Sequence, residues 1–360
     1  MFTNYENTKS QFIPNDSKLF WEKKVKVSFL LSILVFFIHI SSLANYPNTG
    51  NTISRFNQFM DFFVTEGFTR IAVPLFFIIS GATFFRNFRV EIYTTKLKSR
   101  IKTLVIPYLL WNIIYLLFNI ITSYTFVSRY FIGREKFDIS PLNILNAIFH
   151  HGCNGHFWFV FELIIFIIFS PLIYYIIKNK IIATLFICFA TFGVVNGITV
   201  PYISEEGWFY FILGAFLGMH HFAIFSSRAS LKVQIISGVL LLAQFAINLL
   251  KCYEIFILPY RIYYLIFAIG AIAFWFVTDG FIYNLKQRDF FNESFLIYAI
   301  HGIVSPIITK LAYLLMPKSN FFYLVNLCIT ITFVLISTFF FKVIMTKVMP
   351  KTYRLLIGNR

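Results

Sequence analysis

The sequence is dominated by apolar segments of about 20 residues that are separated by short polar breaks. A helix of that length crosses a bilayer, because each residue adds about 1.5 Å and the hydrocarbon core is about 30 Å thick. No fixed-period repeat and no long linker divides the chain, so we predict one all-α integral membrane domain over residues 1–360. It would be a polytopic transmembrane helical bundle of about ten spans, at approximately 27–46, 66–85, 103–123, 157–177, 181–199, 207–222, 232–250, 255–278, 291–316 and 321–346.

Composition supports the membrane interpretation. Of all residues, 58% are hydrophobic and 13% are charged, and the mean hydropathy is +0.75. A soluble domain carries about 25% charged residues. The polar side chains are too few to cover a globule in water, so a lipid bilayer must cover it. We therefore expect a multi-pass protein of the cell membrane.

The net charge of +16 predicts the orientation of the chain. Lys and Arg accumulate in cytoplasmic loops of membrane proteins. With the N-terminus inside, most cations fall in the lead 1–26, in the loop after the second span and in the basic tail 347–360. Both termini are therefore predicted to be cytoplasmic. A nucleic-acid-binding protein would need a basic soluble face, and the sequence offers no soluble domain, so we expect no nucleic-acid partner.

Titratable residues inside predicted spans are costly to bury and are therefore functional candidates. They are His39, Arg70, Glu162, Arg261, His301 and Lys310. His39 lies about 12 residues into the first span, in the outer half of the membrane. It is either a general base, kept neutral by burial, or a packing residue that is hydrogen-bonded to a carbonyl.

Three further residues complete the predicted catalytic group with His39. Arg70 opens the second span and either reaches back to the interface or faces the same cavity as His39, where it would pair with a carboxylate or hold an oxyanion. Glu162 would pair with Arg70 or orient a histidine, and His156 stands at the outer edge of the fourth span. None of these residues has the linear spacing of metal ligands, and the four cysteines form no CxxC pair, so no metal site is predicted.

Six stretches then show a family resemblance. They are FFIH (36–39), TRIAVPLFFIISGATFF (69–85), KLKSRIKTLVIPYLLW (96–111), GHFWFVFELIIFIIFSPLI (155–173), WFYFILGAFLG (208–218) and SFLIYAIHG (294–302). In this order the chain resembles the acyltransferase 3 family of integral membrane O-acyltransferases, which includes bacterial surface-polysaccharide O-acetyltransferases. The resemblance implies transfer from cytoplasmic acyl-CoA, typically acetyl-CoA, to a sugar hydroxyl. It also implies that His39 and Arg70 are the family's first-helix histidine and second-helix arginine.

The nucleotide of acyl-CoA would dock on cations of the inner face. We predict that it contacts Lys26, Arg86, Arg89, Lys98, Arg100 and Lys102, although the positive-inside rule alone would also produce such a strip. Two positions depart from the family. Ser28 stands where an arginine usually lies, eleven positions before the histidine, and Lys26 is the expected substitute. Thr103 stands where a companion of Arg100 is usual.

The chemistry agrees with this resemblance. A sugar hydroxyl is a poor nucleophile that needs a base, and the thioester carbonyl then becomes an oxyanion that needs a donor. We expect an O-acyltransferase that modifies a cell-surface glycan or its lipid-linked precursor. The alternative is a glycan or lipid transporter or flippase, although transporters often contain inverted repeats and none is visible here. A third reading is an inactive relative that serves as a scaffold for polysaccharide-assembly proteins.

Overall fold

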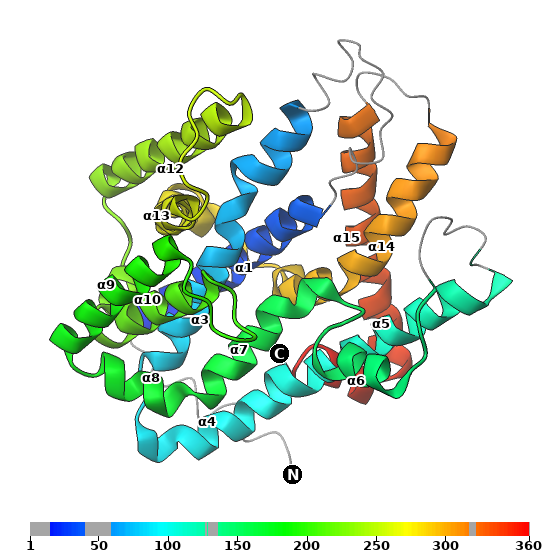
Figure 1. Cartoon of the computed structure of the whole chain (residues 1–360), viewed down its shortest axis with the longest axis horizontal. Helices are drawn as coiled ribbons and strands as arrows, with labels where there is room; N and C mark the ends of the chain where they lie inside the picture. Colours follow the sequence, from blue (N-terminus) through cyan, green and yellow to red (C-terminus); the bar gives the residue numbers. More distant parts are fainter. Residues whose placement is uncertain (1–14, 40–58, 127, 129–135, 317–321, 360) are drawn as a thin grey trace.

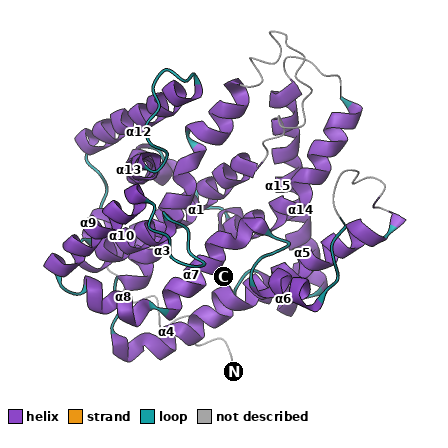
Figure 2. Ribbon diagram, in the orientation of Figure 1, coloured by secondary structure: helices purple, strands orange, loops and turns teal. Residues whose placement is uncertain are grey.

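The computed structural model describes residues 15–39, 59–126, 128, 136–316 and 322–359. These residues form helices joined by short loops (Figures 1 and 2). Within the described ranges no strand forms, and the one isolated β-bridge joins Val200 to Ile203. The predicted all-α class is confirmed.

The helices follow one another along the whole described chain. Their bounds are α1 Asn15–His39, α3 Ala72–Phe85, α4 Tyr93–Arg100, α5 Ile106–Tyr124, α6 Pro141–Phe149, α7 Trp158–Ile168, α8 Ser170–Ile177, α9 Lys180–Asn196, α10 Gly207–His220, α11 Phe222–Ser226, α12 Leu231–Cys252, α13 Ile262–Val277, α14 Ser294–Leu315, α15 Phe322–Val348 and α16 Pro350–Leu356.

Within the described residues, six helical stretches are long and apolar enough to cross a membrane. They are Phe59–Phe85, Val90–Tyr124, Leu231–Cys252, Ile262–Gly280, Asp289–Ala312 and Phe322–Val348. The protein is thus a multi-pass membrane protein, but the predicted count of about ten spans is not confirmed. Helices α9 and α10 are only 17 and 14 residues long. The first predicted span, 27–46, is described only as far as His39.

The fourth predicted span, 157–177, is bent in the structure. Helices α7 and α8 meet at an angle of 69°. Pro171 occupies the first turn of α8, where its missing N–H is tolerated but where a continuous helix would lose a backbone hydrogen bond. The bend turns the C-terminal half of this span away from the direction of α7.

Helix α1 is held in the bundle by two buried lysines. It begins at Asn15, well before the predicted span. The Lys23 ammonium pairs with Asp279 at 2.6 Å, and both side chains are buried. The Lys26 ammonium donates to the carbonyls of Ile282, at 3.2 Å, and Leu285, at 2.7 Å. These contacts fix the N-terminal half of α1 against the segment that follows α13.

Glycines allow α3 and α10 to pack at very short range. A Cβ on Gly214 or on Gly218 would overlap the backbone of α3 at Ile78 and Ala82. A Cβ on Gly81 of α3 would likewise overlap the backbone of α10. Small residues spaced four apart are a common way to bring two membrane helices together.

The C-terminal segment 347–360, expected to be a basic tail, contains a packed helix. Helix α16 lies against α5, where Trp111 Nε1 donates to the Leu356 carbonyl at 3.1 Å. The Tyr353 hydroxyl donates to Glu293 at 2.8 Å. The cytoplasmic location of residues 347–360 stays a prediction.

Candidate functional site

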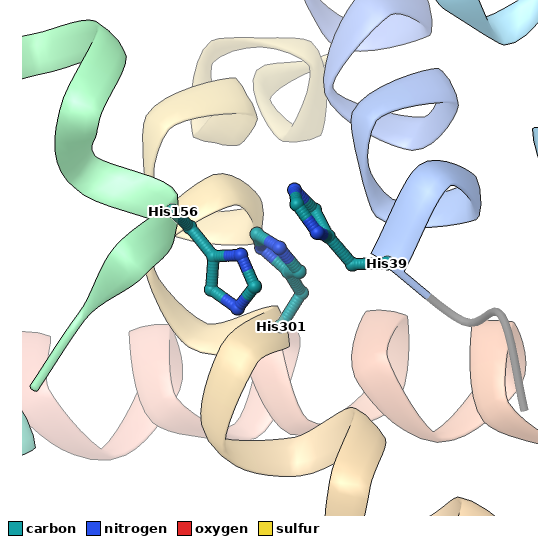
Figure 3. A group of neighbouring side chains, drawn as sticks. All are labelled: His39, His156 and His301. Atoms are coloured by element: carbon teal, nitrogen blue, oxygen red, sulfur yellow. The ribbon is translucent and has the colours of Figure 1, made fainter. Parts of the chain in front are cut away.

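Three imidazoles from different parts of the chain meet inside the bundle (Figure 3). His39 is the last residue of α1, His156 lies in the 3₁₀ turn Gly155–Phe157 that precedes α7, and His301 lies within α14. The ring centroids are 4.0 Å apart for His39 and His156, 4.8 Å for His156 and His301, and 5.5 Å for His39 and His301. We refer to these residues as the three-histidine cluster.

Local contacts explain how His156 reaches α14. A Cβ built on Gly302 would overlap the Tyr115 hydroxyl and would lie 2.5 Å from His156 Cδ2, closer than real side chains pack, so only glycine leaves room for the phenol and the imidazole. The Tyr298 hydroxyl donates to the His156 carbonyl. The Tyr298 ring also stacks on Phe157, with centroids 5.4 Å apart. One turn of α14 therefore leaves space for the His156 ring and holds the 3₁₀ turn that carries it.

The three histidines differ in their surroundings. His39 is exposed, His156 is half-buried and His301 is fully buried. Neither ring nitrogen of His301 has a hydrogen-bond partner among the residues that the structure describes. A buried polar group without a partner costs about 1–3 kcal/mol. The position of His301 beside two other imidazoles therefore needs an explanation beyond packing.

His39 and His156 open onto a cavity of about 400 Å³. Along α1 the cavity is lined by Lys24, Ser28, Val35 and His39, and also by Trp21 and Val25. Spacings of four and seven residues place these side chains on one face of the helix. The distance along α1 from Ser28 to His39 is about 16 Å at 1.5 Å per residue.

Most of the cavity wall is apolar. It includes Phe76, Ile79, Phe84, Phe159, Leu163 and Ile167. Its two cations are Lys24 and Arg100, and uncharged polar side chains line it at Ser28, Ser80, Asn292 and Ser294. The arrangement suits an elongated ligand with an anionic end and a slender, uncharged arm.

The six predicted donor-binding cations do not lie together. Of the six, only Arg100 lines this cavity. Lys98 and Lys102 are exposed near it in the chain. Arg86 and Arg89 line another cavity, of about 670 Å³, together with Lys178 and His220.

Lys26 does not take the place expected for it. Its ammonium is buried and is bound by two carbonyls and by Glu22, at 2.7 Å. The lysine on the cavity side of α1 is Lys24, one turn before Ser28. Lys24 therefore occupies the position that we expected Lys26 to fill.

Arg70 and Glu162 do not pair with each other. The Arg70 guanidinium pairs with Glu66, one turn away, and its side chain is 38% exposed. Arg70 is not among the residues that line the cavity, but it acts electrostatically on His39. Its Nε is buried and has no partner among the described atoms.

Glu162 instead fixes the loop before α10. It accepts hydrogen bonds from the Ser204 N–H at 2.6 Å and from the Ser204 hydroxyl at 3.0 Å. It makes no hydrogen bond to a histidine within the described part of the chain. In the same loop, Glu205 binds Arg261 through two bonds of 2.7 and 2.8 Å, and this hydrogen bonding lowers the pKa of Glu205 below its usual value. Arg261 is thus engaged in an ion pair at the surface.

The arrangement offers two kinds of chemistry. A neutral imidazole at the end of an apolar cavity can accept a proton from a bound hydroxyl. Three imidazoles whose ring nitrogens lie within 4.8 Å of one another can also hold a metal ion, although none was predicted. His301 was recognised in the sequence as a titratable residue within a span, but no role was assigned to it. Its signal was a histidine in the apolar run SFLIYAIHG.

The comparisons with known proteins give one match. A family model described as an acyltransferase domain, that of acyltransferase 3, matches residues 29–346. No curated protein matches the chain, and no solved structure matches it. The matched range contains the three-histidine cluster, Arg70 and Arg100.

Proposed function

The chain belongs to the acyltransferase 3 family, and we propose that this membrane acyltransferase moves an acetyl group from acetyl-CoA to a hydroxyl of a cell-surface glycan or of a lipid-linked glycan precursor. One observation supports the proposal more than any other. A single cavity is lined by cations at Lys24 and Arg100 and by imidazoles at His39 and His156. A donor that carries phosphates at one end and a thioester at the other fits this distribution of charge.

The donor would lie along α1. Its phosphates would bind Lys24 and Arg100, because ammonium and guanidinium groups form charge-assisted hydrogen bonds with phosphate oxygens. Its uncharged arm would lie between the apolar walls, and its thioester would reach His39, which lies about 22 Å along the helix from Lys24. Ser28, between these ends, adds a hydroxyl but no charge to the path.

In the reaction, the His39 imidazole accepts the proton of the acceptor hydroxyl while that oxygen attacks the thioester carbonyl carbon. The new carbon–oxygen bond forms, the carbon–sulfur bond breaks, and the CoA thiolate leaves with the proton returned by the imidazolium. A positioned base of this kind contributes about 10²–10⁴-fold. His156, whose ring centroid lies 4.0 Å from that of His39, would help to hold the imidazole and relay its proton.

We propose that Arg70 stabilises the oxyanion that forms on the thioester carbonyl oxygen. Glu66 holds one end of the guanidinium, which leaves the buried Nε as a donor without a partner among the described atoms. A fixed oxyanion donor is worth about 3–4 kcal/mol in the transition state. Arg70 already acts electrostatically on His39, which supports its presence near the reacting atoms.

The test compares surface glycans and donor turnover. Surface glycans from cells with the protein should carry an acetyl-sized mass that is missing without it. Purified protein should release free CoA from acetyl-CoA when given glycan from the deficient cells. His39→Gln should lower this release by about 10²–10⁴-fold, while His221→Gln, at the start of α11, should not.

Two results would overturn the proposal. Full turnover by His39→Gln would remove His39 from the mechanism. Movement of the acceptor across the membrane in the absence of any acyl donor would instead favour a transporter.

A further inference from the structure

We propose that the three-histidine cluster binds a divalent transition-metal ion, with zinc as the best fit, and that the bound ion blocks acyl transfer. The binding site stands on the geometry of the cluster alone. The inhibition rests on the proposed function, because it needs a reaction to inhibit.

The ligand set is that of a zinc site with one open position. Each histidine offers one ring nitrogen, and these atoms lie within 4.8 Å of one another. Three imidazoles plus an exchangeable water are a common zinc coordination, with Zn–N bonds of about 2.0–2.1 Å and therefore N–N distances of about 3.3 Å. Small rotations of the rings would close the remaining difference.

The surroundings of His301 favour a role as a metal ligand over a role in packing. Its ring is fully buried, and neither nitrogen makes a hydrogen bond of ordinary geometry in the described part of the chain, although the Tyr298 and Ile297 backbone acts on the ring. Coordination would satisfy one of these nitrogens. The other two ligands open onto the cavity, which gives an ion a route to the cluster and leaves its fourth position free.

The charges near the cluster set its selectivity. Imidazole ligands favour Zn²⁺, Co²⁺, Ni²⁺ and Cu²⁺, whereas Mg²⁺ and Ca²⁺ need oxygen ligands. No carboxylate belongs to the cluster as described. Arg70 acts electrostatically on His39 and so opposes a dication, although Glu66 offsets part of its charge. Removing the Arg70 charge should therefore strengthen metal binding.

The inhibition follows from competition for one lone pair. His39 needs an unprotonated ring nitrogen to accept the proton of the acceptor hydroxyl. A metal ion bound through that nitrogen occupies the same lone pair. A chelator that removes the ion should then restore transfer.

The binding experiment uses full-length protein that is purified without a histidine tag, stripped with chelator and titrated with Co²⁺. We expect one ion per chain and the visible absorption of tetrahedral Co²⁺. Loss of a residue that only supports a metal ligand costs about 10–100-fold in affinity. Each of His39→Ala, His156→Ala and His301→Ala should therefore weaken binding by more than this. His220→Ala and His221→Ala, two histidines outside the cluster, should bind like the wild type, and Arg70→Gln should bind more tightly.

The outcomes separate the two proposals. Cobalt binding that survives in the triple histidine variant, or no binding by wild-type protein whose thermal unfolding is normal, would overturn the metal site. These measurements need no acyl donor, so they are independent of whether transfer occurs. With active protein, Zn²⁺ should inhibit CoA release, and inhibition that is unchanged in His301→Ala would overturn the inhibitory role.

Discussion

Ser28 shows how one side chain on α1 affects the binding of the proposed donor. It lines the cavity one turn after Lys24, on the face that ends at His39. Lys26, only two positions from Lys24, points about 200° away around the helix and binds carbonyls instead. The charge on the cavity side of this stretch of α1 therefore comes from Lys24, whose ammonium lies over the Trp21 ring.

Adding a guanidinium at Ser28 should improve donor binding. We expect Ser28→Arg to lower the KM for acetyl-CoA by about tenfold, because a hydrogen bond to a charged group is worth about 1.5 kcal/mol or more. Ser28→Gln is the control for added size without charge. Steady-state kinetics of CoA release measure both variants, and an equal change in the two would mean that charge at this position plays no part.

The space beside Gly302 allows a second prediction. Gly302→Ala should displace the His156 ring, lower kcat for CoA release and weaken Co²⁺ binding. Gly155→Ala changes the residue next to His156 but places its methyl group in open space. Its kcat for CoA release and its Co²⁺ affinity should therefore stay at the wild-type level. Normal kinetics in Gly302→Ala would show that the position of His156 is not critical.

The sequence predicted part of this site for a physical reason. His39 and His156 could be identified because a titratable side chain in or beside an apolar run is costly to bury and is therefore a functional candidate. The partner of Glu162 could not be predicted, because Ser204 lies in a loop far along the chain. The partner of Arg70 was missed, although Glu66 stands four residues before it, where helical side chains meet. The meeting of His301 with the other two rings depends on how α1, α7 and α14 pack, which linear spacing does not encode.

Whole helices were easier to anticipate than their ends and bends. Apolar length located the helices that cross the membrane, because burying a long apolar stretch in lipid outweighs local preferences. The bend of 69° before Pro171 was missed, although proline marks a boundary where a helix commonly breaks. The early start of α1 was missed because Lys23 and Lys26 resemble solvated charges until their partners near α13 are known.

The contact between α3 and α10 should depend on its glycines. Gly214→Ala places a methyl group into the backbone of α3 and should lower the free energy of unfolding by about 1–3 kcal/mol. Gly238→Ala, in the middle of α12, meets no atom within 4 Å and should be neutral or stabilising by up to about 1 kcal/mol. Thermal unfolding in detergent compares the two, and equal midpoints would show that α3 and α10 can separate without loss of stability.

Across the whole molecule, the number of crossings decides where the termini lie. Six helical stretches and the bent pair make at most seven candidate spans. An odd number would put the two ends of the chain on opposite sides. If the bent pair crosses and both termini are cytoplasmic, as the distribution of Lys and Arg predicts, α1 must also cross, and α9 and α10 add either two crossings or none.

Cysteine labelling in intact cells tests this topology. In a background with the other three cysteines changed to serine, exposed Cys252, at the end of α12, should react with an impermeant maleimide from outside. In a background without native cysteines, Ser227→Cys, in the exposed loop before α12, should react only after the cells are opened. The reverse pattern would invert the predicted orientation.

Helix α1 has one more consequence for the whole molecule. Lys24, one of the two groups proposed to bind the donor phosphates, and the proposed base lie on the same continuous helix, so the separation of Lys24 from His39 cannot adjust as it could across a hinge. Acyl carriers with a shorter arm would anchor correctly yet leave their carbonyl short of the imidazole. The fixed distance along one helix would thus select acyl carriers by the length of their arm, whatever acyl group they carry.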